Sequence, residues 1–178
     1  MTVPDWHEEP VQKAHDRDAF NCNDHDLNEY LRKFARQNHE HGGAKTFLAI
    51  SNGDGRVLGY YSLAPTSARY EQTPDSARKG LPRHAVPGFR LARLATDARL
   101  QGEGLGTQLL LAAGLRCIKV AGEVGGVALF IDAKTERAAK WYEGRGAERL
   151  IGVPEGFPVP LMISLKTPEA ALKAAGKL

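Results

Sequence analysis

The stretch QGEGLG, residues 101–106, places three glycines within five positions, at the start of the apolar run LGTQLLLAAGLRCIKVAG. A dinucleotide-binding fingerprint would need a glycine at position 107, where the chain has Thr107, and a Walker A loop would need a lysine after Gly106. The remaining pattern is Q-x-x-G-x-G before a helix, which we expect over residues 105–121. A helix N-terminus carries unpartnered N–H groups and a partial positive charge, and glycines let a ligand approach the backbone. The loop therefore predicts a site for an anion such as a pyrophosphate.

The segments on either side of this loop predict a mixed α/β fold. Apolar runs predict a β-hairpin at 46–52 and 56–65, a strand at 88–97, a buried parallel strand at 126–134, and strands at 147–154 and 159–165. Further helices are expected at 21–43, 136–146 and 168–178, with Leu27, Leu31 and Phe34 on the buried face of the first. Residues 74–87 are expected to form a surface loop. The order predicts a βαβ unit at the centre of the domain.

Composition predicts one soluble domain over residues 1–178, because 42% of the residues are hydrophobic and 25% are charged. No apolar stretch is expected to approach the ~20 residues that a membrane helix needs. The N-terminal sequence does not resemble a signal peptide, so a cytoplasmic protein is expected. Cys22 and Cys117 lack C-x-x-C spacing, and the spacing of His39 and His41 puts them on different helix faces. We therefore expect no disulfide and no metal site.

Positive charge is concentrated in one part of the chain. Residues 69–93 hold six basic side chains against Glu71 and Asp75, whereas the whole chain has a net charge of +3. Such a block is typical either of a solvated surface loop or of contact with a polyanion such as a nucleic acid. Composition alone leaves both interpretations open.

The glycine loop and its surroundings resemble one superfamily. The strand RLARLAT, the loop RLQGEGLG, the helix TQLLLAAGL and the later stretch AAKWYEGRGA are similar to the GNAT acyl-CoA N-acyltransferases, over most of residues 45–165. The resemblance implies a central mixed β-sheet flanked by helices, with acetyl-CoA as the cofactor. The loop backbone would hold its pyrophosphate, and the preceding strand would pair with its pantetheine arm. The implied cofactor contacts are Leu94, Ala95, Thr96, Gln101, Gly102, Glu103, Gly104, Leu105, Gly106, Thr107, Thr135 and Ala138.

Ala138 and Tyr142 match the A-x-x-x-Y pattern of many GNAT proteins. The resemblance implies that the Tyr142 hydroxyl lies near the thioester sulfur and protonates the departing thiolate. A phenol of pKa about 10 can donate to a thiolate whose acid has a pKa near 8.5. The alternative is a core aromatic residue beside Trp141.

Two positions depart from the pattern: Thr135 stands where many relatives have asparagine, and Ala147 where many have phenylalanine.

Three longer motifs narrow the resemblance. FNCNDHDLNEYLRKFARQ, VLGYYSLAPTSARY and GFRLARLATDARLQGEGLG are similar to the type II toxin–antitoxin toxins that acetylate aminoacyl-tRNA. The resemblance implies transfer of an acetyl group to the α-amine of aminoacyl-tRNA, a ribbon-helix-helix antitoxin partner and a homodimer. No general base is evident, and an α-amine of pKa about 7.7–8.0 needs little help to lose its proton. The residues expected to contact tRNA are Arg32, Lys33, Arg36, Arg78, Lys79, Arg83, Arg90 and Arg93.

Two other functions remain open from the sequence. A housekeeping GNAT enzyme that acetylates a small amine or a protein N-terminus would not need the basic block. A non-enzymatic acyl-CoA-binding domain on the same fold would not need Tyr142.

Overall fold

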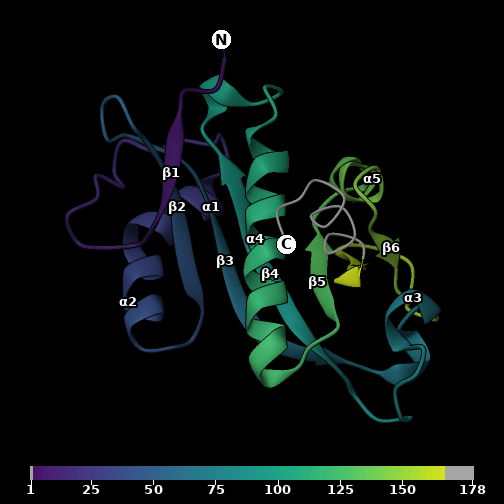
Figure 1. Cartoon of the computed structure of the whole chain (residues 1–178). Helices are drawn as coiled ribbons and strands as arrows, with labels where there is room; N and C mark the ends of the chain where they lie inside the picture. Colours follow the sequence, from purple (N-terminus) through teal and green to yellow (C-terminus); the bar gives the residue numbers. More distant parts are fainter. Residues whose placement is uncertain (1, 167–178) are drawn as a thin grey trace. The chain divides into compact units, whose positions relative to one another are not determined.

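The computed structural model describes residues 2–166, which form two compact units (Figure 1). The first unit comprises residues 2–64 and 92–113, and the second comprises residues 65–91 and 114–166. The strand β4 (Val86–Thr96) and the helix α4 (Leu105–Val124) contribute residues to both units. The single domain over residues 1–178 stays a prediction, and the helix predicted at 168–178 lies outside the described residues.

The first unit contains the predicted hairpin, formed by β2 (Lys45–Ser51) and β3 (Val57–Ala68) in antiparallel pairing. A further strand, β1 (Trp6–Pro10), pairs antiparallel with β2 and was not predicted. Its sequence WHEEP is polar, because an edge strand is held by backbone hydrogen bonds and needs no continuous apolar face.

The predicted first helix is present but interrupted. It consists of α1 (His25–Glu29), a π-helical segment η1 (Tyr30–Phe34) and α2 (Ala35–Glu40). Asp24 caps its N-terminus by accepting a 3.2 Å hydrogen bond from the Leu27 N–H. The prediction that Phe34 is buried is wrong: Phe34 is 53% exposed, and Ala35 is fully buried instead. A π turn holds more residues than an α turn, so it shifts the apolar face by one position.

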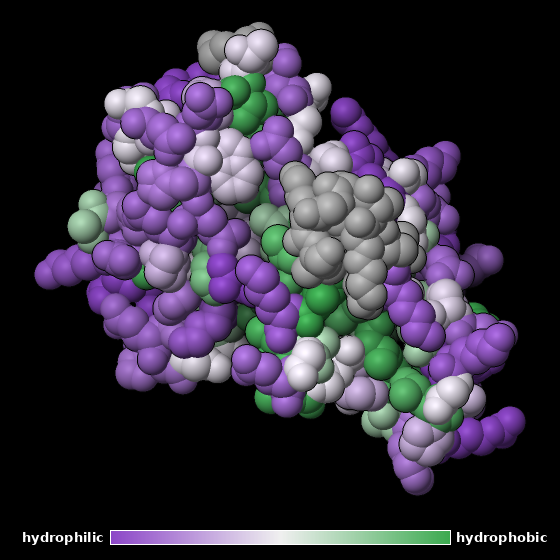
Figure 2. All heavy atoms as spheres, in the orientation of Figure 1, coloured by the Kyte–Doolittle hydropathy of each residue, from purple (hydrophilic) through white to green (hydrophobic). Residues whose placement is uncertain are grey.

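The core of the first unit gathers around Tyr60. Its ring lies 5.7 Å from that of Phe20 and 6.5 Å from that of Tyr30, centroid to centroid. Its hydroxyl donates a 2.7 Å hydrogen bond to the Leu27 carbonyl, and burial raises the pKa of Tyr60 above its usual value. α2 contacts β2, and Figure 2 shows mainly hydrophilic residues on the side of this unit where α2 and β1 lie.

The second unit is built on the predicted parallel pair. Gly88–Leu91 of β4 pairs parallel with Ala128–Ile131 of β5 (Ala128–Ala133), and α4 connects the two strands as in a βαβ unit. β5 then pairs antiparallel with β7 (Val159–Ser164), which also pairs with β6 (Glu148–Arg149). Helix α5 (Glu136–Glu143) contacts β5 and β7. The mixed α/β architecture and the central βαβ order are therefore as predicted.

Three predictions in or near the second unit need correction. Residues 74–87 are not only a loop: they include the helix α3 (Asp75–Arg78), and Ala77 and Val86 are buried in the core. The strand predicted at 147–154 is reduced to β6, since Gly152 and Pro154 interrupt it. Helix α4 is long and apolar enough to cross a membrane by length and composition, contrary to the expectation above. The core helices of soluble proteins meet the same criterion.

Candidate active site residues

The glycine loop lies in the first unit and ends at the N-terminus of α4. Gly102 and Gly104 have φ angles of +81° and +94°, a conformation that glycine adopts without strain. A Cβ atom on either would meet no other atom within 4 Å, so the backbone is open on that side. The Gly104 carbonyl accepts a 3.2 Å hydrogen bond from the Gln108 N–H, and the first turn of α4 holds no acidic residue. This geometry suits an anion at the start of the helix.

Gln101 holds the loop in place through its side chain. Its amide nitrogen donates a 3.0 Å hydrogen bond to the Cys22 carbonyl and a longer one, 3.4 Å, to the Thr96 carbonyl. Leu100, directly before it, is 1% exposed. The Gln101 side chain therefore supports the loop, and its backbone is the part left for a cofactor.

Asp97 precedes the loop and was not assigned a role from the sequence. It is 3% exposed and accepts three hydrogen bonds from Arg99, at 2.9 Å from the backbone N–H and 3.0 Å from each of Nε and Nη2. Burial alone would raise the pKa of Asp97, but the hydrogen bonds from Arg99 outweigh it and hold the pKa below its usual value. The sequence shows only an aspartate with an arginine two positions later, and the burial that makes the contact important appears in the structure.

The strand expected to hold the pantetheine arm, Leu94–Thr96, forms the last three residues of β4. Ala95 is buried, and its carbonyl would lie 2.8 Å from a Cβ atom at Gly59. Gly59 therefore lets β3 approach β4 closely. The Asp97 N–H, directly after β4, donates a 2.8 Å hydrogen bond to the Leu58 carbonyl.

Tyr142 lies in the second unit, on α5. Its ring meets that of Trp141 edge-on, with centroids 4.9 Å apart. Burial raises the pKa of Tyr142 to about 12, so the hydroxyl keeps its proton at any physiological pH. Among residues 2–166, no hydrogen bond to this hydroxyl is found. Tyr142 is thus a protonated phenol.

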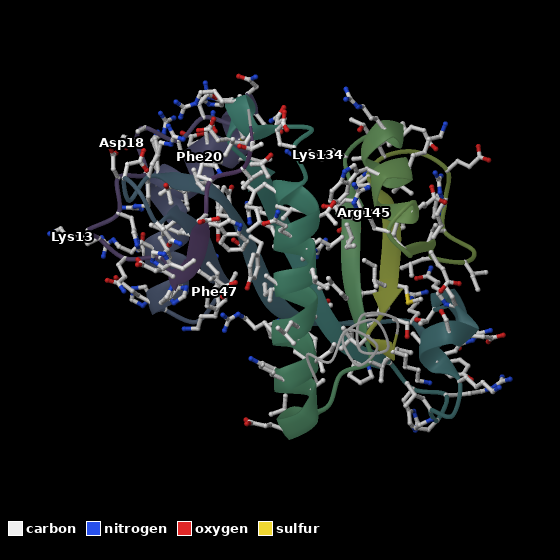
Figure 3. All side chains as sticks on the ribbon, turned by 45° about the horizontal axis from the view of Figure 1, so that its top comes forward. Lys13, Asp18, Phe20, Phe47, Lys134 and Arg145 are labelled. Atoms are coloured by element: carbon white, nitrogen blue, oxygen red, sulfur yellow. The ribbon has the colours of Figure 1, made fainter. Side chains whose placement is uncertain are left out.

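Helix α5 is fixed at both ends. The Thr135 hydroxyl caps its start by accepting a 3.1 Å hydrogen bond from the Ala138 N–H, so these two residues, expected to contact the cofactor, support the helix. Arg149 binds Glu136 at 2.6 Å and Glu143 at 2.9 Å, a clamp that the sequence did not reveal. Beyond the helix, Arg145 stacks 3.8 Å from the Trp141 ring centroid, beside α5 (Figure 3).

The structure divides the expected tRNA contacts between the two units. In the first unit, Lys33 pairs with Glu29 at 2.6 Å and Arg36 with Glu40 at 2.8 Å. Arg93 lies on β4 with its guanidinium 3.5 Å from the Tyr30 ring centroid. The basic residues of the first unit are Arg32, Lys33, Arg36 and Arg93, and those of the second are Arg78, Lys79, Arg83 and Arg90.

Two arginines of the second unit meet at one aromatic ring. The guanidinium groups of Arg78 and Arg83 lie 5.0 and 5.8 Å from the Tyr70 ring centroid. Arg78 also binds Asp75 at 2.8 Å and the Tyr70 carbonyl at 2.9 Å, whereas Lys79 is exposed. Arg90 pairs with Asp132.

No group of three or more histidine, cysteine, aspartate or glutamate side chains in the described part of the chain is placed to hold a metal ion.

The chain is similar to several known proteins. No protein-family model matches the chain. The tRNA-acetylating toxin of Mycobacterium tuberculosis (strain ATCC 25618 / H37Rv) is 34% identical over 162 residues, which cover 91% of this chain and 93% of the relative. AtaT complexed with acetyl-methionyl-tRNAfMet has a TM-score of 0.84 and 27% identity, covering 94% of this chain and 99% of that one. AtaTR bound with acetyl-CoA has a TM-score of 0.77 and 27% identity, covering 94% of this chain and 98% of that one.

The fold and the glycine loop at α4 define an N-acetyltransferase of the GNAT class, as the sequence predicted. Within that class, the chain belongs to the family of tRNA-acetylating toxins.

Proposed function

We propose that this protein transfers an acetyl group from acetyl-CoA to the α-amine of aminoacyl-tRNA and thereby blocks translation. The observation that carries the proposal is the open glycine loop at the start of α4, with Gly102 and Gly104 in the left-handed region. The name of the Mycobacterium tuberculosis relative and the ligands in the AtaT complexes support it.

The loop fits acetyl-CoA because Gly102 and Gly104 leave its backbone open, with no other atom within 4 Å of where a Cβ would stand. The backbone N–H groups of residues 101–107 would hold the pyrophosphate, and the strand residues 94–96 would hold the amide-rich arm. Glu103 is exposed within the loop, and we assign its backbone, not its carboxylate, to this site. Thr135 and Ala138 act indirectly, by starting the helix that carries Tyr142.

Acetyl-CoA supplies a thioester, and the protein supplies an acid for its sulfur. The amine nitrogen forms a bond to the acetyl carbon as the carbon–sulfur bond breaks. Tyr142 donates its phenol proton to the departing sulfur. The raised pKa of Tyr142 ensures that the phenol still carries this proton. The proton of the amine leaves through water, since an α-amine near neutral pH needs no strong base.

The exposed basic residues of both units are proposed to contact the tRNA backbone. Phosphate contacts from lysine and arginine supply most sequence-independent affinity for nucleic acids. Lys79 is exposed. The guanidinium groups of Arg93 and Arg78 already lie over the rings of Tyr30 and Tyr70, respectively. We further propose a cytoplasmic homodimer that a ribbon-helix-helix antitoxin neutralises.

One experiment tests this function. Purified protein is incubated with radiolabelled acetyl-CoA and total aminoacyl-tRNA, with deacylated tRNA and free amino acids as controls. Label is expected on charged tRNA alone, and cell-free translation is expected to stop only when acetyl-CoA is present. Label on free amines or on a protein N-terminus, with none on charged tRNA, would favour a housekeeping acetyltransferase. Binding of acetyl-CoA without transfer to any acceptor would favour a non-enzymatic domain.

A further inference from the structure

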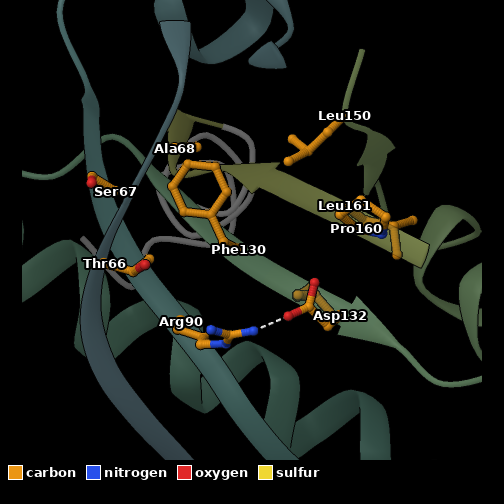
Figure 4. A pocket seen from close by; sticks show the side chains of 10 residues that line it. Thr66, Ser67, Ala68, Arg90, Phe130, Asp132, Leu150, Pro160 and Leu161 are labelled. Atoms are coloured by element: carbon orange, nitrogen blue, oxygen red, sulfur yellow. Dashed lines mark hydrogen bonds and ion pairs between the residues drawn. The ribbon is translucent and has the colours of Figure 1, made fainter. Parts of the chain in front are cut away.

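Apart from Arg90, one of the proposed tRNA contacts, the residues that line a pocket in the second unit have no role in the function described so far (Figure 4). Leu150, Pro160 and Leu161 form its apolar side, and the Phe130 ring lies between them and Ser67. We call this hollow the β4–β5 pocket, because the charged residues at its edge come from those two strands. They are Arg90 and Asp132, which pair with each other.

The pocket lies where the parallel pairing of β4 and β5 ends. The last paired residues are Leu91 and Ile131, directly beside Arg90 and Asp132 in sequence. Ligands of parallel sheets bind beyond the carboxyl ends of the strands, where neighbouring strands diverge. β5 then leads through Thr135 into α5, which carries Tyr142. The pocket is thus formed by the strand that leads to the candidate acid.

The charges of the pocket are balanced. The Arg90 and Asp132 side chains are 51% and 36% exposed, and each is the partner of the other. A charged group placed against the apolar wall of the pocket would lose part of its hydration there and gain no ion pair from that wall. An uncharged, apolar group has no charge to dehydrate, and burial of its apolar surface would contribute favourable free energy of binding. The apolar wall of the pocket therefore favours an uncharged, apolar group.

We propose that the β4–β5 pocket receives the side chain of the amino acid carried by the tRNA and that it selects an apolar side chain. This inference rests on the proposed function and specifies its substrate class. A single methylene in an apolar pocket changes kcat/KM by about 10–200-fold, so the preference is measurable.

The first test compares charged tRNAs on the wild-type protein. Initial rates of acetyl transfer are measured with tRNAs carrying methionine, isoleucine, leucine, glycine, lysine and aspartate. We expect kcat/KM for at least one of the three apolar residues to exceed that for glycine by about tenfold or more, and charged residues to be poor substrates. A wild-type preference for glycine, lysine or aspartate would overturn the inference.

Two pocket variants test the assignment of residues. Leu150→Ala removes part of the apolar wall, and Ala68→Leu fills the opposite side. Both are expected to lower the ratio of the best apolar substrate to glycine several-fold. The matched control is Ile151→Ala, because Ile151 follows Leu150, is 48% exposed and does not line the pocket. A ratio within one substrate pair is insensitive to a uniform loss of folded protein or of tRNA affinity.

A third variant tests the charge balance. Asp132→Asn leaves Arg90 unpaired at the edge of the pocket, so the rate with aspartyl-tRNA should rise relative to that with lysyl-tRNA. Unchanged substrate ratios in all three variants would overturn the inference while leaving the proposed function intact. Absence of transfer to every charged tRNA would overturn the proposed function, and the inference with it.

Discussion

The side-chain amide of Gln101 donates a 3.0 Å hydrogen bond to the carbonyl of Cys22, 79 residues earlier in the chain. The bond joins the start of the glycine loop to the segment before α1. This contact within the first unit therefore helps to fix the shape of the loop.

Gln101→Ala should weaken acetyl-CoA binding without abolishing it. The two hydrogen bonds of the side chain are lost, and each contributes about 0.5–1.5 kcal/mol, so we expect the dissociation constant to rise on the order of tenfold. Titration calorimetry measures the change. The control is Gln37→Ala, on the exposed face of α2. Equal affinities for both variants would show that the Cys22 contact does not support the binding site.

Gly104→Ala should raise the dissociation constant of acetyl-CoA by at least an order of magnitude. Alanine in the left-handed region costs about 1–2 kcal/mol, and the added methyl group would project into the open side of the loop. Gly80→Ala is a closely matched control, because Gly80 has a φ angle of +87° and also has no neighbour within 4 Å. Both variants should lose similar stability in thermal melts, and only Gly104→Ala should lose affinity. Normal binding by Gly104→Ala would remove the loop from the cofactor site.

Tyr142→Phe should slow transfer by about 10²–10⁴-fold while acetyl-CoA affinity stays unchanged. The ring and its edge-on contact with Trp141 remain, so only the proton donor is lost. Single-turnover kinetics with one charged tRNA measures the effect, and Tyr70→Phe in the same unit is the control. A wild-type rate for Tyr142→Phe would mean that Tyr142 is only a packing residue.

The pH dependence follows from the raised pKa of Tyr142. An acid with a pKa of about 12 keeps its proton as the pH rises, so its contribution persists to at least pH 10. The rate should rise as the acceptor amine loses its proton, near or below its free pKa of about 7.7–8.0, and should then stay level. Rates from pH 6 to 10, taken at short times because the ester hydrolyses, test this. A decline between pH 8 and 10 that is absent from Tyr142→Phe would contradict it.

Lys79→Glu should reduce transfer to charged tRNA and make it less dependent on salt. Lys79 is exposed, so its substitution disturbs little else, whereas Arg78 also binds Asp75 and the Tyr70 carbonyl. Each lost phosphate contact lowers the slope of log affinity against log salt by about one. Lys13→Glu is the control, since Lys13 projects away from the first unit (Figure 3). Identical salt slopes for both variants would exclude Lys79 from the tRNA interface.

The sequence predicted the elements that carry strong local signals. The hairpin of β2 and β3, the parallel pair of β4 and β5 and the helix after the glycine loop each have a clear apolar period or a glycine boundary. It did not predict β1, because backbone pairing with β2 and long-range side-chain contacts such as the Tyr61 hydroxyl to Glu8 leave no local apolar pattern. The burial of Ala35 was also not predicted, because no local residue pattern indicates a π turn.

The candidate site was predictable in part. The glycines and Tyr142 stand in motifs of fixed spacing, whereas the roles of their neighbours depend on long-range contacts. Thr135 serves as a helix cap and Gln101 as a tether to Cys22. Arg93 was expected to contact tRNA, and its guanidinium lies against the ring of Tyr30, from a distant part of the chain. Spacing in the sequence cannot reveal which side chain meets another after folding.

The π-helical segment at Tyr30–Phe34 affects where the protein can tolerate the insertion or deletion of a residue. A π turn holds more residues than an α turn, so the helix from residue 25 to 40 contains a surplus residue. Loss of one residue there, such as Lys33, would convert the segment to a regular helix in which Leu31 and Ala35 still share the buried face. The same deletion within α4 would rotate every later side chain by about 100°. Insertions and deletions that survive selection in this helix should therefore cluster at the π turn.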